Sequence, residues 1–231
     1  MLPKFHKKPA KKRVLVLFYS LGGKTGDLAR EIARGAQEVE NTQTEVKRVP
    51  ELIPQEVFDN NPELKKRQEA FAKEYPLATV DDLVSADAVA FGTPVHFGSF
   101  ASQLKQFIDQ LSPVYVKGQM VNKPAAVFCV SGTIHSGEEL TLVSLMIPLI
   151  NLGMIPVGIP YPIQGTGPEF DAGSPYGAVF ISGRDGKREL AQDDRKTANI
   201  LGQRLALMAH LLGCGCDRCK SLHEAIKREH Q

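Results

Sequence analysis

The sequence predicts an α/β protein whose core is a five-stranded, doubly wound parallel sheet with helices on both faces. Apolar runs of strand length alternate with helical patterns along the chain, and such alternation produces parallel strands joined by helices. The run at 14–19 is apolar throughout, as expected for a strand buried on both faces. With 231 residues, of which 42% are hydrophobic and 23% charged, the chain is long enough for one sizeable core.

The predicted strands are short apolar or alternating segments bounded by turn residues, at 14–19, 44–49, 86–92, 125–130 and 154–159. The second of these alternates apolar and polar residues, so we expect it nearer the edge of the sheet. A loop rich in glycine and proline, 160–177, interrupts the fifth strand, and 178–182 is predicted to continue that strand or to pair with it.

The main predicted helices share apolar residues at three- and four-residue spacing, at 28–36, 101–110, 138–151 and 192–212. The polar stretch 55–77 differs from them. We expect it to be an exposed excursion, not a second domain, with a helix at 63–74 between Pro62 and Pro76. A short amphipathic turn is expected at 80–84.

Polar, glycine-bearing loops directly follow three of the predicted strands, at 20–25, 93–98 and 131–137. The carboxyl ends of parallel strands share one edge of the sheet, and ligands bind beyond that edge near the point where the strand order reverses. Three such loops arise by chance much less readily than one. The pattern therefore predicts a single ligand site built from all three.

The first loop has the features of a phosphate site, and its residues are Ser20, Leu21, Gly22, Gly23, Lys24 and Thr25. A helix that starts here has free amides and a positive dipole end, the hydroxyls add donors, and glycine allows close approach. The loop is neither a nucleotide-triphosphatase loop, because Phe18 stands where that loop needs glycine, nor a G-x-G-x-x-G motif. The alternative is an ordinary strand-to-helix turn without a ligand.

Together the three loops resemble those of the flavodoxin-like WrbA family of FMN-dependent NAD(P)H:quinone oxidoreductases, over about 13–212. The matching motifs are 92–98 (GTPVHFG) with Gln103, Phe107, Asp109 and Gln110, then 131–133 with Thr141, then 173–177 (GSPYG) and 183–186 (GRDG). The resemblance implies a flavodoxin-like fold, FMN as cofactor, NADH or NADPH as electron donor, and a quinone or similar acceptor.

The resemblance also implies roles by position. The first loop would hold the FMN phosphate, and two further groups would line the flavin ring: Thr93, Pro94, Val95, His96 and Phe97 on one side, and Ser131, Gly132, Thr133, Ile134, His135 and Gly137 around the other edge. Tyr115 stands where the family has a tryptophan on the substrate side, and its ring would stack on a quinone or nicotinamide. The alternative is a surface tyrosine. No side chain is needed as a nucleophile, because the flavin carries the chemistry.

Several positions depart from the family pattern. His96 replaces an arginine beside the flavin, and a histidine is charged only part of the time near neutral pH. Residues 151–152 replace a histidine pair, and the loop 131–137 is one residue longer than expected. These departures bear on how the reduced flavin is stabilised and on what reaches the substrate from a neighbouring subunit.

The function predicted from these residues is two-electron hydride transfer from NADH or NADPH through FMN to quinones or similar acceptors. The alternative is a flavodoxin-like electron-transfer protein without its own NAD(P)H site, and a third possibility is a flavin-free scaffold with interaction tails. Family members form dimers and tetramers that complete the flavin pocket between subunits, so we expect a homodimer or homotetramer.

The two ends of the chain are expected to lie outside the FMN-binding domain at 13–212. The arm at 1–12 is basic, and a solubilising role is expected for it; nucleic acid is not an expected partner. The tail at 213–231 carries a potential metal-binding set, Cys214, Cys216, Cys219 and His223. Three thiolates and an imidazole suit zinc or part of an iron–sulfur site, and the alternative is a tail of reactive thiols or an oxidised disulfide.

The expected location is the cytoplasm. No apolar signal segment follows the basic start, and nothing in the cysteine usage indicates secretion. The most apolar segment, 140–159, contains two prolines, so it is interpreted as a core helix and strand and not as a membrane span. Cys129 lies in an apolar strand and is predicted to be a small core residue.

Overall fold

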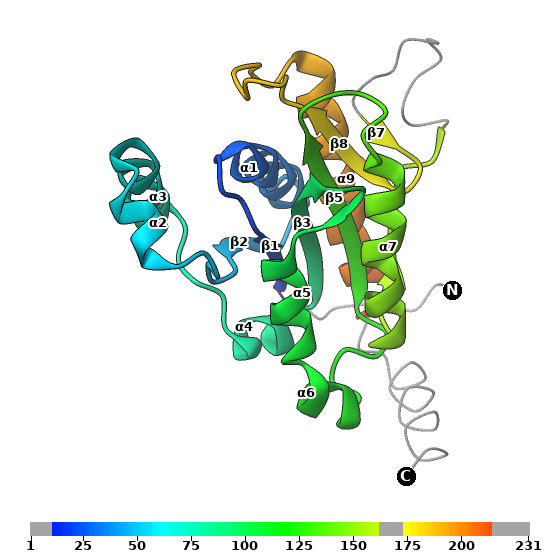
Figure 1. The fold of residues 1–231 in the computed structure, drawn as a ribbon. Coiled ribbons are helices and arrows are strands. Elements are labelled where there is room, and N and C mark those ends of the chain that lie inside the picture. Colours follow the sequence, from blue (N-terminus) through cyan, green and yellow to red (C-terminus); the bar gives the residue numbers. More distant parts are fainter. Residues whose placement is uncertain (1–10, 162–172, 214–231) are drawn as a thin grey trace, which may run out of the picture.

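The computed structural model describes residues 11–161 and 173–213. Five parallel strands cross the sheet in the order β2 (Thr42–Arg48), β1 (Lys12–Phe18), β3 (Ala88–His96), β5 (Pro124–Ser131) and β8 (Gly177–Ile181). Three two-residue strands complete it: β4 (Ser99–Phe100), β6 (Ile155–Pro156) and β7 (Gly173–Ser174). The strand β2 lies at the edge of the sheet beside β1, and the following strands are added on the other side of β1, which is the flavodoxin-like arrangement. The predicted fold class is therefore confirmed (Figure 1).

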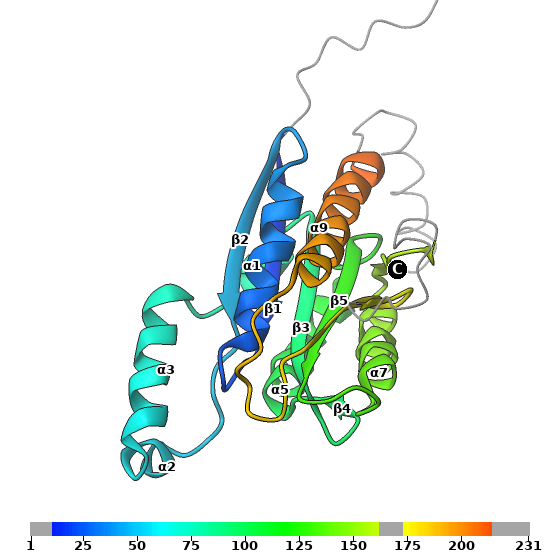
Figure 2. The same ribbon diagram turned by 90° about the horizontal axis from the view of Figure 1, so that it is seen from above.

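Helices cover both faces of the sheet, as predicted (Figure 2). One face packs against α1 (Lys24–Gln37) and α9 (Gln192–Leu212), and α3 (Pro62–Glu74) adds aromatic side chains at its margin. The other face packs against α4 (Val80–Ser85), α5 (Ser102–Asp109) and α7 (Glu138–Asn151).

The helices α1 and α9 approach each other closely because each has a glycine at the contact. A Cβ on Gly202 would lie 2.0 Å from the carbonyl oxygen of Ile32, and one on Gly35 would lie 2.1 Å from that of Asn199. Neither helix could carry a side chain there without moving away. The final helix is thus packed directly on the helix that follows the first loop.

The strand β3 is longer than predicted. The prediction ended it at Gly92, but the strand runs on through His96 and turns back as β4, where Val95 pairs with Phe100. Phe97 and Gly98 form the turn, with φ of 52° and 72°. Two successive residues with positive φ match the twist of an antiparallel hairpin. The segment predicted as a loop is therefore mostly a hairpin.

The fifth position of the sheet is filled in two pieces. The predicted strand at 154–159 is regular only over β6, which pairs with Pro124 and Ala125 of β5. After the excursion, β8 pairs with Phe128–Ser131 further along the same strand. The second segment therefore continues the fifth strand, as one of the two alternatives predicted. The interruption occurs where Gly158 passes the Pro175 carbonyl, with room for no side chain.

The excursion 55–77 contains α2 (Gln55–Asp59), which the sequence did not reveal, and α3, which it did. Asn61 caps α3 by accepting a hydrogen bond from the Leu64 amide at 3.1 Å. The helix α6 (Ser112–Val116) was also not predicted, because five residues are too few to display a helical period. At the N-terminal end of the domain, β1 begins at Lys12, the last residue of the predicted arm. The Lys12 ammonium lies 3.0 Å from Asp87 Oδ1.

Candidate functional site

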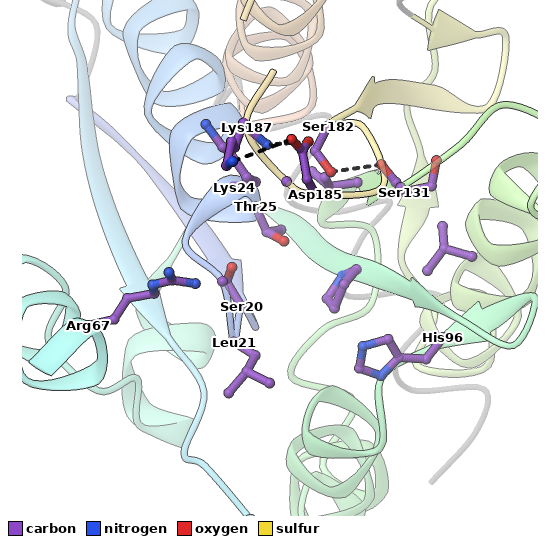
Figure 3. Close-up of a pocket in the computed structure, with 16 residues that line it drawn as sticks. Ser20, Leu21, Lys24, Thr25, Arg67, His96, Ser131, Ser182, Asp185 and Lys187 are labelled. Carbon is purple, nitrogen blue, oxygen red and sulfur yellow. Dashed lines mark hydrogen bonds and ion pairs between the residues drawn. The ribbon is translucent and has the colours of Figure 1, made fainter. Parts of the chain in front are cut away.

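A cavity of about 540 Å³ opens at the carboxyl edge of the sheet (Figure 3). Its lining comes from all three predicted loops and from two further segments, through Ser20, Leu21, Gly22, Lys24, Thr25, Arg67, Pro94, Val95, His96, Val130, Ser131, Gly132, Ser182, Asp185, Gly186 and Lys187. Residues from each of the three loops therefore lie at one cavity, and whether a ligand binds there stays a prediction. The size falls within the range of about 300–1,000 Å³ that is typical of cofactor sites.

The first loop presents the start of α1 to the cavity. The residue before the helix is Gly23, at φ 94°, and no side chain caps the helix. The Gly23 amide itself donates to Ser20 Oγ at 2.9 Å, which holds the loop closed. A Cβ on Gly22 would meet no protein atom within 4 Å, so space remains on that side of the backbone. Open amides at a positive helix end suit an anion.

Thr25 supplies a hydroxyl to the same end of the cavity. The residue is 2% exposed, yet its Oγ1 makes no hydrogen bond with any residue from 11–161 or 173–213. In Figure 3 this hydroxyl points into the space between the loop that carries Ser20 and the strand that carries His96. The oxygen itself is open to the cavity, because the fully buried side-chain oxygens without a partner among the described residues belong to Glu31, Thr141 and Thr197. A phosphate oxygen would satisfy Thr25, and the site therefore fits the phosphate of FMN.

The hairpin β3–β4 forms one wall of the cavity with Pro94, Val95 and His96. Thr93, also predicted to bind, is fully buried and structural: its Oγ1 accepts the Ala101 amide at 2.9 Å. Phe97 lies at the hairpin turn, is fully exposed and does not line this cavity.

His96 is exposed as a residue, but the neighbouring protein atoms partly desolvate its imidazole and lower the pKa of the ring, because desolvation disfavours the charged form. The ring is therefore mainly neutral at neutral pH. It meets Tyr19 edge-on, with ring centroids 6.5 Å apart. Tyr19 is anchored in turn by Glu51 and Gln103, whose side chains lie 2.9 Å from its hydroxyl. Burial, followed by the Glu51 charge, raises the pKa of Tyr19 far above its usual range, so it stays a neutral phenol.

The third loop divides between two cavities. Ser131 and Gly132 line the first, whereas Ile134, His135 and Gly137 line a second one of about 560 Å³ beside β7 and β8. Two further predicted residues, Gly23 and Thr133, line neither. The division follows from packing, since a Cβ on Gly137 would lie 2.8 Å from Gly98 Cα, and this contact turns the distal half of the loop toward α7.

Some lining residues were not among the predicted site residues. Ser182, Asp185, Gly186 and Lys187 follow β8, where Ser182 Oγ donates to the Ser131 carbonyl at 3.0 Å and joins the two loops. A polar glycine-bearing turn after an apolar strand was the available signal there. Arg67 comes from α3, and nothing in its local sequence indicates a site.

Other predicted residues lie elsewhere. Tyr115 is on α6, at the end of the sheet away from the cavity in Figure 1, and is 60% exposed. The residues Cys214, Cys216, Cys219 and His223 lie outside the described residues. Within 11–161 and 173–213 no group of metal-ligating side chains is found, and Cys129 is fully buried in the core as predicted.

The strand order places the protein in the flavodoxin-like class, and the uncapped helix beside a hydroxyl-lined cavity is the part of the site that fits a phosphate. The chain belongs to the NADPH-dependent FMN reductase family, whose sequence model matches residues 13–168.

Relatives and solved structures agree with this assignment. A Geobacter sulfurreducens protein named NAD(P)H dehydrogenase (quinone) is 39% identical over 198 residues, covering 85% of this chain and 97% of the relative. One of the same name from Aromatoleum aromaticum is 39% identical over 202 residues, covering 87% and 97%. The crystal structure of a WrbA-like flavodoxin from Agrobacterium tumefaciens superposes with a TM-score of 0.60 at 20% identity, covering 87% of this chain and 98% of that one, and supports the fold. Among the described residues, no helix is long and apolar enough to cross a membrane.

Proposed function

We propose that the protein is an FMN-dependent oxidoreductase that transfers electrons from NADH or NADPH to quinones or similar acceptors. The observation that carries the proposal is the convergence of three separate loops on one cavity at the uncapped start of α1. The relatives are named for the same activity, and their alignments with this chain cover almost their whole length, which supports the proposal. When bound, FMN supplies two-electron redox chemistry between a nicotinamide and an acceptor.

In this proposal the protein binds and orients the cofactor without a covalent link. The amides after Gly23 and the hydroxyls of Ser20 and Thr25 hold the phosphate, and each charge-assisted hydrogen bond contributes about 1.5–3 kcal/mol. Pro94–His96 line one side of the ring, and Ser131 with Gly132 line the other edge. His96, being mainly neutral, offers a hydrogen bond to the ring without a fixed charge.

The helix α7 supports the proposal that the protein is an oligomer. Its outward face carries Leu140, Val143, Ile147 and Ile150, which are 63%, 38%, 56% and 54% exposed. The inward face is apolar as well, and a helix that is apolar all round is normally covered on both sides. A second copy of the chain is the occupant we propose, and only such a copy could bring a Tyr115 ring to the flavin.

The test is an absorbance spectrum followed by a turnover assay. Purified protein, or protein titrated with FMN, should show bound flavin, and it should oxidise NADH or NADPH when benzoquinone is added. A preparation that binds no FMN on titration would overturn the proposal. A preparation that binds FMN but turns over only with a separate reductase would instead be an electron carrier.

A further inference from the structure

Three cationic side chains line the first cavity, those of Lys24, Arg67 and Lys187, and two of them have a carboxylate nearby. The Lys24 ammonium lies 2.7 Å from Glu189 Oε1, and Lys187 Nζ lies 3.8 Å from Asp185 Oδ2. Arg67 makes no hydrogen bond or ion pair with any residue in the described part of the chain. Among the three, its charge is therefore the one that no carboxylate of the described residues approaches within 4 Å, and the pair that Lys187 forms is weak, because its side chains are 83% and 63% exposed.

The position of Arg67 is set by firm packing of α3 against the first loop. The next residue, Gln68, donates from Nε2 to the Leu21 carbonyl at 3.1 Å. One turn further on, Phe71 packs edge-on against Phe18 of β1, with ring centroids 5.6 Å apart. The helix that carries the arginine is thus fixed to the strand and the loop that open the cavity.

The surroundings of Arg67 match the chemistry of a phosphate monoester. In Figure 3 its guanidinium points toward Ser20, on the side of the cavity away from His96. The same end holds the uncapped start of α1 and the unpartnered, 2% exposed Thr25. A phosphate monoester carries about −1.5 to −2 charges at pH 7. A guanidinium binds such a group through two parallel hydrogen bonds.

We propose that Arg67 binds the phosphate of FMN, together with the start of α1, and so adds to the preference of this site for FMN over riboflavin. The inference rests on the proposed function and adds to it a contact from the excursion, outside the three loops. The 2′-phosphate of NADPH has the same chemistry. Because Arg67 lies beside Ser20 and Thr25, the FMN phosphate is the ligand we propose. The test below distinguishes it from the 2′-phosphate of NADPH.

The test compares FMN with riboflavin, which lacks only the phosphate. Dissociation constants are measured by quenching of flavin fluorescence for the wild type, Arg67→Gln, Arg67→Lys and the control Lys66→Gln, which alters an exposed neighbour outside the cavity. Arg67→Gln should weaken FMN binding about tenfold or more and leave riboflavin binding unchanged. The dissociation constant of Arg67→Lys for FMN should lie between those of the wild type and Arg67→Gln, because lysine keeps the charge but cannot donate two parallel hydrogen bonds. The control should match the wild type.

The outcomes separate this inference from the proposed function. If the wild type binds neither flavin, the proposed function fails. If the wild type prefers FMN and Arg67→Gln keeps the full preference, only the inference is wrong. Equally weakened binding of FMN and riboflavin would also overturn the inference, since Arg67 would then affect binding of the part that the two flavins share and not of the phosphate. A rise in KM for NADPH but not NADH, with FMN binding unchanged, would assign Arg67 to the coenzyme and overturn the FMN assignment.

Discussion

Thr93 and Ala101 are joined by a hydrogen bond that closes the hairpin forming one wall of the proposed flavin site. The Ala101 amide donates to Thr93 Oγ1 at 2.9 Å, and both residues are fully buried. The same hydroxyl donates to the Pro94 carbonyl at 2.9 Å. One side chain therefore fixes both ends of the segment that carries Val95 and His96.

Replacing Thr93 by valine should destabilise the protein by about 1–3 kcal/mol, because the shape is kept but a buried amide loses its partner. Urea unfolding measures the change. FMN binding should weaken as well, since the wall at Pro94–His96 is less firmly held. Thr93→Ser keeps the hydroxyl and serves as the control. Equal stability of the valine and serine variants would contradict this role.

Gly202→Ala should destabilise the protein by about 1–3 kcal/mol through overpacking. The destabilisation is expected because the added Cβ would lie 2.0 Å from the Ile32 carbonyl oxygen. Without this clash the substitution would stabilise the helix by about 1 kcal/mol, so the sign of the measured change tests the contact. Thermal unfolding measures it, with the exposed Lys196→Ala on the same helix as control. A more stable Gly202→Ala variant would mean that α1 and α9 are not in such close contact.

Cys129 should resist alkylation in the native protein at pH 8. Burial, followed by the charge of Glu138, raises the pKa of its thiol far above the usual range, so the reactive thiolate does not form. Mass spectrometry of the peptide containing Cys129 after iodoacetamide treatment, with and without urea, tests this. Rapid labelling without urea would show that the strand β5 opens.

The influence of His96 on the flavin should appear only at low pH. Its pKa lies below the ordinary value of 6.5, so the imidazole becomes positive only as the pH falls below that value. The reduction potential of bound FMN should match in wild type and His96→Gln at pH 8, and should become higher in the wild type than in the variant as the pH is lowered stepwise below 6.5. A positive group beside the ring favours the reduced, more negative cofactor. A difference already present at pH 8 would contradict the assignment, and His96→Arg should raise the potential at both pH values.

Ile147→Glu should convert the oligomer into monomers. The side chain is 56% exposed on the apolar outward face of α7, and a carboxylate buried in an interface there would be unpaired. Light scattering gives the mass, and Ile147→Val is the conservative control. A wild type that is monomeric at micromolar concentration would rule out the proposed partner.

The fold, and the loop that precedes α1, could be predicted from sequence because both are indicated by local patterns. An apolar run followed at once by Ser20–Thr25 and a helical period fixes strand, loop and helix order without knowledge of the rest. The third loop was harder, because whether Ile134 or Ser131 faces the first cavity depends on the contact of Gly137 with Gly98. That contact lies between loops almost 40 residues apart.

Arg67 shows the limit of sequence interpretation most clearly. It stands among charged residues on a helix that reads as a solvated surface, and its place at the site depends on how Phe71 packs against Phe18. The extent of β3 was missed for a related reason. The pairing of Val95 with Phe100 depends on a turn at Phe97, a residue type that rarely adopts positive φ.

The helix α1 begins without a side-chain cap of its own, so an anion bound there, as proposed, would cap the helix. A ligand that binds only the folded state adds to its stability in proportion to the logarithm of its free concentration. With FMN bound at the proposed site, the folding equilibrium of this chain would be coupled to the supply of flavin, and cells short of riboflavin would hold a less stable, more readily degraded population. Cofactor availability would thus regulate the amount of enzyme as well as its turnover.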